Sequence, residues 1–283
     1  MAPVLELPRS VLLALWLQGG TANGAEYVVT GDDEPHDVVG GRYYDLEELV
    51  EDIAERHYDV TALLPAPGDP LVGPPDAAAA GECVLVHNND QGWNLAIVPE
   101  VHRFGSRFEP GATVVWHTHE VDDWRPGLLG AVGSLDDAER ALREGLHLAT
   151  TALVDLDVAR WRPDAAERIA AVRDGSLPVD RLPAEFQAWP QRVAVMMQGA
   201  RLRAIVALAA EDAGGAVNLW QSDQRSTALR EVDRLARRAM SAASAWVRGD
   251  EVRRYAAEKQ REREEESRRQ RGERHGRREE GGS

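Results

Sequence analysis

Cysteine is almost absent from this chain, since Cys83 is the single one among 283 residues. This excludes an intrachain disulfide and a zinc site built from several cysteines. Lysine is equally scarce, since Lys259 is the single lysine and the chain has 32 arginines. This bias is typical of a GC-rich bacterial genome. Glycine-rich phosphate loops and the G-x-S-x-G nucleophile elbow are also missing from the sequence. The common nucleotide-binding and serine-hydrolase signatures are therefore excluded.

Long hydrophobic runs are lacking too, because no apolar run reaches the length that spans a bilayer. The most apolar stretch near the N-terminus, residues 11–17, is short and follows an acidic residue, Glu6. We therefore interpret it as a buried first helix, with a signal peptide as the alternative. Together these features predict a cytoplasmic protein without a membrane partner and without a bound cofactor.

Acidic residues outnumber basic ones in this chain, and the charges are unevenly distributed along it. The net charge is −15. Residues 251–283 hold eleven basic residues and nine glutamates, or +2, so residues 1–250 hold 22 basic and 39 acidic residues, or −17. A body this acidic repels phosphate backbones. We therefore expect no nucleic-acid binding by the folded part.

Hydrophobic patterning predicts an α+β fold with a small antiparallel sheet and flanking helices in residues 1–130. The predicted helices are residues 7–18 and 44–57. The predicted strands are residues 60–64, 82–87, 93–98 and 113–118, and residues 27–29 are a further short extended piece.

Residues 131–250 are predicted to form an all-helical region, either packed on the sheet or forming a bundle. Ser134 and Asp137 resemble a capping box that opens one helix. A second helix runs from Pro163 to Gly175, a third covers residues 184–211 with an interruption at Pro190, and a fourth covers residues 221–247. In the fourth helix, roughly heptad spacing suggests a coiled coil at Leu229, Val232, Leu235 and Met240. The Arg/Glu-rich tail, residues 251–283, predicts a helical extension that frays into disorder.

The stretch VVWHTHE, residues 114–120, is the clearest candidate for a metal site in the sequence. Alternate side chains share one face of a strand, so His117 and His119 should point the same way and Trp116 the other way. Two such imidazoles can bind one zinc ion with a carboxylate, and zinc with an open position activates water for hydrolysis.

The third ligand is the open question at this predicted zinc site. Asp123 and Asp137 are the candidates for metal ligation beside His117 and His119. Alternatively, the two histidines lie partly exposed at an edge or mouth of the sheet and hydrogen-bond to Asp122, Asp123 or water. Cys83, inside a strand, is predicted to be a core residue.

The segment His117-Thr118-His119, followed by Ser134-Leu135-Asp136-Asp137, faintly resembles the JAB/MPN metallo-isopeptidases. Those enzymes carry His-Ser/Thr-His at a strand end, then Ser-x-x-Asp and an upstream catalytic glutamate, for which Glu82 is the candidate here. This chain departs from the pattern, because Glu120 stands where the family has proline and the gap to Ser134 is about twice the usual one.

A second resemblance is broader and covers about residues 7–248. The stretches that carry it are LPRS at 7–10, GDDEPH at 31–36, LPAPGDP at 64–70 with GPP at 73–75, LDVARWRP at 156–163 and RLRAIV at 201–206. They resemble a family of uncharacterised actinobacterial proteins, which implies a bacterial cytoplasmic protein of unknown role.

Two functional hypotheses follow from these observations. The first is a non-enzymatic interaction or regulatory protein, whose helical half or tail binds a protein partner. It rests on the absence of a complete catalytic constellation. The alternative is a zinc-dependent hydrolase that uses the His-x-His strand motif.

Overall fold

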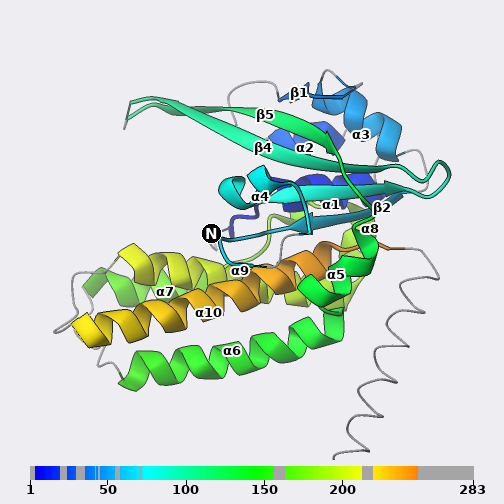
Figure 1. The fold of residues 1–283 in the computed structure, drawn as a ribbon. Coiled ribbons are helices and arrows are strands. Elements are labelled where there is room, and N and C mark those ends of the chain that lie inside the picture. Colours follow the sequence, from blue (N-terminus) through cyan, green and yellow to red (C-terminus); the bar gives the residue numbers. More distant parts are fainter. Residues whose placement is uncertain are drawn as a thin grey trace, which may run out of the picture. The chain divides into compact units, whose positions relative to one another are not determined.

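Five strands form a mixed sheet in the first half of the chain (Figure 1). The spatial order is β1-β5-β4-β3-β2, with antiparallel pairing from β2 through β5 and parallel pairing of β1 with β5. The strands are β1 (Asp37–Val39), β2 (Tyr58–Leu63), β3 (Cys83–Asn88), β4 (Asn94–Gly105) and β5 (Pro110–Glu120). The predicted α+β class is confirmed, and β1, which the sequence analysis did not predict, makes the sheet mixed.

The structure is a computed structural model, and it describes residues 4–19, 24–29, 36–41, 43, 45–54, 58–69, 72–106, 108–155, 163–211 and 219–247. Residues Met1–Trp246 form one compact unit. The predicted tail at 251–283 lies outside the described residues, and so do residues 31–35 of the GDDEPH stretch.

Ten α-helices are present in these ranges, and most lie where local signals predict them. They are α1 (Arg9–Gly19), α2 (Gly24–Val29), α3 (Leu46–Ala54), α4 (Pro75–Ala80), α5 (Arg125–Ala131), α6 (Leu135–Asp155), α7 (Pro163–Asp174), α8 (Ala184–Gln187), α9 (Pro190–Glu211) and α10 (Leu219–Ser244). The break predicted at Pro190 separates α8 from α9. The extended piece predicted at residues 27–29 is wrong, because Tyr27 lies in α2 and stacks on Trp16 of α1 at 4.4 Å between ring centroids.

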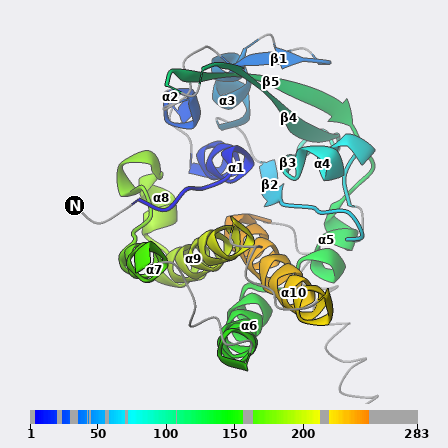
Figure 2. The same ribbon diagram turned by 90° about the vertical axis from the view of Figure 1, so that its left-hand side faces the viewer.

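Helices cover both faces of the sheet (Figure 2). Helix α1 packs against β2 and β3, with α2 and α3 beside it, while α4 contacts β4. Residues 11–17 of α1 are all buried. The apolar run is therefore the core of the first helix, as predicted. Cys83 is also a buried free cysteine, and burial raises the pKa of its thiol to about 12.

Helices α6, α9 and α10 form the helical part, and α10 lies along β2. The residue Gly199 lets α9 and α10 approach closely, because a Cβ at this position would lie 2.7 Å from Cγ of Met240. At the sheet, Ala62 N–H donates to Ser244 Oγ at 3.0 Å, and Val60 forms an antiparallel bridge with Trp246. The end of α10 thus covers the β2 edge of the sheet.

Helix α9 corrects one expectation from the sequence. Residues Pro190–Ala210 are long and apolar enough to cross a membrane, judged by length and composition only. The core helix of a globular protein passes the same test when it is mostly buried, whereas 33% of the apolar window in α9 is buried. The buried residues of α9 include Val195, Met196, Ala200 and Leu202.

Candidate functional site

Strand β5 presents the two predicted histidines on one face. His117 and His119 are partly exposed, whereas the alternating residues Trp116 and Thr118 are buried on the other face. The indole N–H of Trp116 donates to Nδ1 of buried His36 at 3.1 Å, which ties β5 to the start of β1. The two-residue period predicted from the sequence is confirmed.

Each of these imidazoles lies beside a carboxylate of its own. His117 Nε2 is 2.8 Å from Glu100 Oε2 on β4. His119 Nε2 is 2.8 Å from Asp76 Oδ2 on α4, within ion-pair distance but without hydrogen-bond geometry. The alternative partners predicted from the sequence, Asp122 and Asp123, are therefore wrong. The real partners come from neighbouring elements of the fold.

The two carboxylates proposed as metal ligands are engaged elsewhere. Asp123 accepts hydrogen bonds from Nη2 of Arg125 at 2.7 Å and from its Nε at 2.9 Å, and these bonds hold the pKa of Asp123 below its usual range. Asp137 accepts from the hydroxyl and the backbone N–H of Ser134, and Ser134 Oγ accepts from Asp137 N–H. The predicted capping box is confirmed.

Glu82, the candidate for an upstream catalytic glutamate, contacts the first helix. Its Oε2 accepts the backbone N–H of Ser10 at 2.8 Å, in the first turn of α1, where a carboxylate stabilises the helix dipole. Within the described part of the chain, no group of three His, Cys, Asp or Glu residues is arranged to hold a metal ion. The zinc ligand set His117, His119, Asp123 and Asp137 stays a prediction.

A buried polar cluster, which no sequence motif predicts, lies near α5 where β2 begins and β3 ends. Asp59 and His87 are directly paired across β2 and β3, and both are buried. His87 Nδ1 lies 2.8 Å from Asn94 Oδ1, while Asp59 accepts from Asn89 at 3.2 Å and from Arg125 at 3.4 Å. These partners satisfy the buried groups and fasten α5 to the sheet, which is a structural role.

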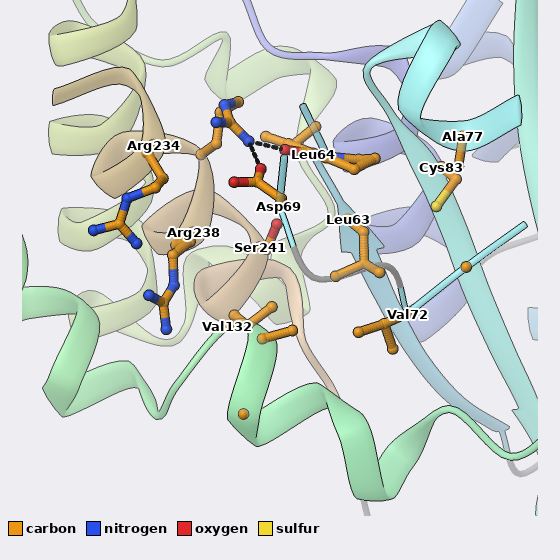
Figure 3. A pocket seen from close by; sticks show the side chains of 15 residues that line it. Leu63, Leu64, Asp69, Val72, Ala77, Cys83, Val132, Arg234, Arg238 and Ser241 are labelled. Carbon is orange, nitrogen blue, oxygen red and sulfur yellow. Dashed lines mark hydrogen bonds and ion pairs between the residues drawn. The ribbon is translucent and has the colours of Figure 1, made fainter. Parts of the chain in front are cut away.

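Two hollows border α10, and we call them together the arginine groove. The narrow hollow, about 120 Å³, lies between the 63–73 segment, the end of α5 and α10 (Figure 3). The wide hollow, about 790 Å³, lies between residues 66–69, α9 and α10. Both are lined by Asp69, Arg234 and Arg237. In Figure 3, Arg234 and Arg238 project from α10 on one side, with Ala77 and Cys83 on the opposite side.

Two guanidinium groups inside the groove are fully engaged with carboxylates. Arg237 Nη1 donates to Asp69 Oδ2 at 2.5 Å and to the carbonyl of Leu64 at 2.6 Å, and its Nε donates to Asp233 at 2.7 Å. Arg234 forms two hydrogen bonds with Glu231 one turn earlier in α10. These pairs hold the groove in shape and neutralise two of its charges.

The other two guanidinium groups have no carboxylate partner among the residues that the structure places. Arg230, in the wide hollow, donates to neutral oxygens: the carbonyl of Ser226 at 3.2 Å and the hydroxyl of Thr227 at 3.1 Å. Arg238 lines the narrow hollow and makes no hydrogen bond or ion pair with the described residues. The nearby carboxylate of Glu231 is bonded to Arg234. Arg234, and more weakly Arg238, lowers the pKa of Glu231. The groove thus holds uncompensated positive charge in an acidic body.

Comparison with protein families gives two matches that together cover most of the chain. Residues 10–129 match the model described as Rv1486c-like protein, N-terminal domain, and residues 136–241 match Rv1486c-like protein, C-terminal domain. This chain belongs to the Rv1486c-like protein family. Searches of curated proteins and of solved structures gave no match.

The broad resemblance predicted from the sequence is thus borne out as the Rv1486c-like family, a family of unknown function, and nothing in the comparisons supports JAB/MPN isopeptidases. The two family domains meet at the arginine groove, because residues 63–73 belong to the N-terminal match and α10 to the C-terminal match. The domain boundary predicted near residue 130 stays a prediction. The residues before and after it belong to one compact unit, Met1–Trp246.

The sequence signal for this groove lies in the spacing of charged residues and not in the spacing of apolar ones. Arg230, Arg234 and Arg238 follow one another at intervals of four residues, with Arg237 beside them. Residues four apart lie on the same side of a helix. The spacing of charges along residues 219–244 of this sequence therefore shows the arginine row, although not the loop that faces it.

Proposed function

We propose that this Rv1486c-like protein is a non-enzymatic interaction protein whose arginine groove binds an acidic segment of a protein partner. The observation that carries the proposal is the pair of uncompensated guanidinium groups, Arg230 and Arg238, in a body with 17 more acidic than basic residues. Arginine binds carboxylates with a planar fork of donors, so guanidinium groups that line the two hollows without a carboxylate partner suit a carboxylate-bearing ligand.

The spacing of these arginines favours an extended segment over a single small anion. Eight residues separate Arg230 from Arg238, which corresponds to ~12 Å along the helix axis. An extended peptide advances about 3.3 Å per residue, so two acidic side chains four residues apart span ~13 Å. One bound phosphate could neutralise one of these guanidinium groups but not both.

The lining of the wide hollow is consistent with a peptide as well. Apolar side chains flank the arginines there, from Pro67, Val206, Ala209 and Leu229. Alternating acidic and apolar side chains would therefore find complementary surfaces in the groove. Nucleic acid fits less well, because the surrounding acidic body repels a continuous phosphate backbone.

The test is fluorescence anisotropy with a labelled peptide that carries two glutamates four residues apart, separated by leucine and alanine. We expect saturable binding to the full-length protein that weakens at least tenfold in the Arg230→Gln/Arg238→Gln variant. A peptide with glutamine in place of glutamate controls for apolar binding. The matched protein control is Arg140→Gln/Arg143→Gln, which removes two exposed arginines of α6 that already pair with Asp137 and Glu139. Equal affinity in both double variants would remove the basis of the proposal.

The zinc-dependent hydrolase remains an untested prediction. Its two histidines contact separate carboxylates on β4 and α4.

A further inference from the structure

The hairpin of β4 and β5 extends beyond the rest of the sheet (Figure 1). We call residues 100–114 of this hairpin the arm. Strand β3 pairs with β4 as far as Ile97, and β1 pairs with β5 from Val115 onward. Within the described residues, the two strands of the arm therefore pair only with each other. A two-stranded ribbon is marginally stable in isolation, and its free edges can accept another strand.

The tip of the arm displays two aromatic side chains to solvent. Phe104 is 51% exposed and Phe108 is 91% exposed. The turn between them requires glycine at position 105. Gly105 has a positive φ of 86°, and a Cβ there would lie 2.2 Å from the carbonyl oxygen of Glu109. Ser106 Oγ accepts the backbone N–H groups of Phe108 and Glu109, both at 3.2 Å. These bonds fix the turn that carries Phe108, and the two exposed phenylalanines make the tip of the arm apolar.

Charge identifies the kind of surface that would receive the arm. The tip of the arm, residues 101–108 (VHRFGSRF), contains two arginines and no acidic residue, and Arg103 is exposed. The arm also holds Glu100, which lies beside His102 and His117, and Glu109 at the turn. Helix α3 has the opposite character, since LEELVEDIA holds four acidic residues and no basic one. Glu47 and Glu51 are exposed on α3, and the neighbouring edge strand β1 presents Val39 at 49% exposure.

We propose that the arm binds a second copy of this chain, along the edge formed by β1 and α3. The arm supplies aromatic side chains, arginine and a free strand edge. The receiving edge supplies glutamates, the exposed Val39 and the outer side of β1 beyond the bridge that Asp37 forms with Asp45. Charge and apolar surface are therefore complementary within one sequence. Reciprocal exchange of two arms closes a twofold dimer, the commonest symmetry of soluble oligomers. This interface does not involve the arginine groove.

The experiment is sedimentation velocity of the full chain from about 1 µM to about 100 µM, a range that detects dissociation constants of ordinary dimers. We expect a monomer–dimer equilibrium. Phe104→Ser/Phe108→Ser should weaken the dimer at least tenfold, and so should Arg103→Glu alone or Glu47→Arg/Glu51→Arg alone. The triple variant that combines both charge reversals should return to within about threefold of the original dimer, because attraction is restored with the signs exchanged.

Arg173→Glu serves as the matched control, because Arg173 is an exposed arginine of α7 outside the arm. Circular dichroism establishes that each variant is folded. A protein that stays monomeric over the whole range overturns the proposal. So does a dimer that survives the loss of both phenylalanines, or a triple variant that remains as weak as the single reversals.

Discussion

Arg237→Met should destabilise the fold strongly, because Arg237 joins α10 to the segment that follows β2. Its side chain is only 8% exposed, and it donates to Asp69, Asp233 and the carbonyl of Leu64. Methionine fills similar volume without any of these donors. The carbonyl of Leu64 then loses its charged donor, and Asp69 keeps the hydrogen bond from the backbone N–H of Ala66.

The expected loss of unfolding free energy follows from these lost hydrogen bonds and ion pairs. Removing one partner of a buried, hydrogen-bonded ion pair costs about 3–5 kcal/mol. Domains of this class unfold with about 5–15 kcal/mol, so the variant should lose a large part of its stability. Arg237→Lys should cost less, since it keeps the charge but loses the fork that reaches Leu64 and Asp69 together.

Urea unfolding followed by circular dichroism measures the loss. The Arg237→Met/Asp69→Leu double variant provides the control, because it removes both charges and should recover ~2 kcal/mol relative to the sum of the single changes. A loss below about 1 kcal/mol for Arg237→Met would refute the reasoning that this residue holds the loop to α10.

Three further outcomes can be measured. Burial raises the pKa of Asp69, but hydrogen bonds from Arg237 and Ala66 outweigh burial and lower it. The Arg237-dependent stability should therefore be complete above the unfolded pKa of about 3.9 and be lost as the pH falls through the lower folded pKa, which acid titration of wild type and Arg237→Met resolves. The purified protein and His117→Ala/His119→Ala should contain the same negligible zinc by elemental analysis; stoichiometric zinc lost in the variant contradicts this. Cys83 should resist thiol reagents at neutral pH until the protein unfolds, because its pKa is raised to about 12 by burial.

Local signals in the sequence predicted local structure well. The capping pair Ser134 and Asp137 defines the start of α6, and Pro163 and Pro190 stand at the first residues of α7 and α9. Such signals act within a few residues, so no knowledge of the fold is needed to use them. The region around Tyr27 failed for the opposite reason: its apolar β-branched neighbours suggest a strand, but packing on Trp16 of α1 selects a helix.

The candidate sites required information about pairing between distant segments. Strand period alone placed His117 and His119 on one face. Their carboxylate partners, Glu100 and Asp76, depend on the register of β4 with β5 and on the position of α4. The arginine groove has the same character, since Arg237 and Asp69 lie 168 residues apart in sequence. Spacing on one helix can show the arginines, but only the fold shows what faces them.

The most direct test of the proposed function is the dependence of peptide affinity on the spacing of two glutamates. A series with one, three and seven residues between the glutamates, measured by anisotropy at constant salt, compares segments that span different distances along α10. If Arg230 and Arg238 bind one segment together, affinity should be highest with three intervening residues, a span of ~13 Å, and Arg230→Gln/Arg238→Gln should abolish that preference. An affinity that is the same at all three spacings would contradict the account.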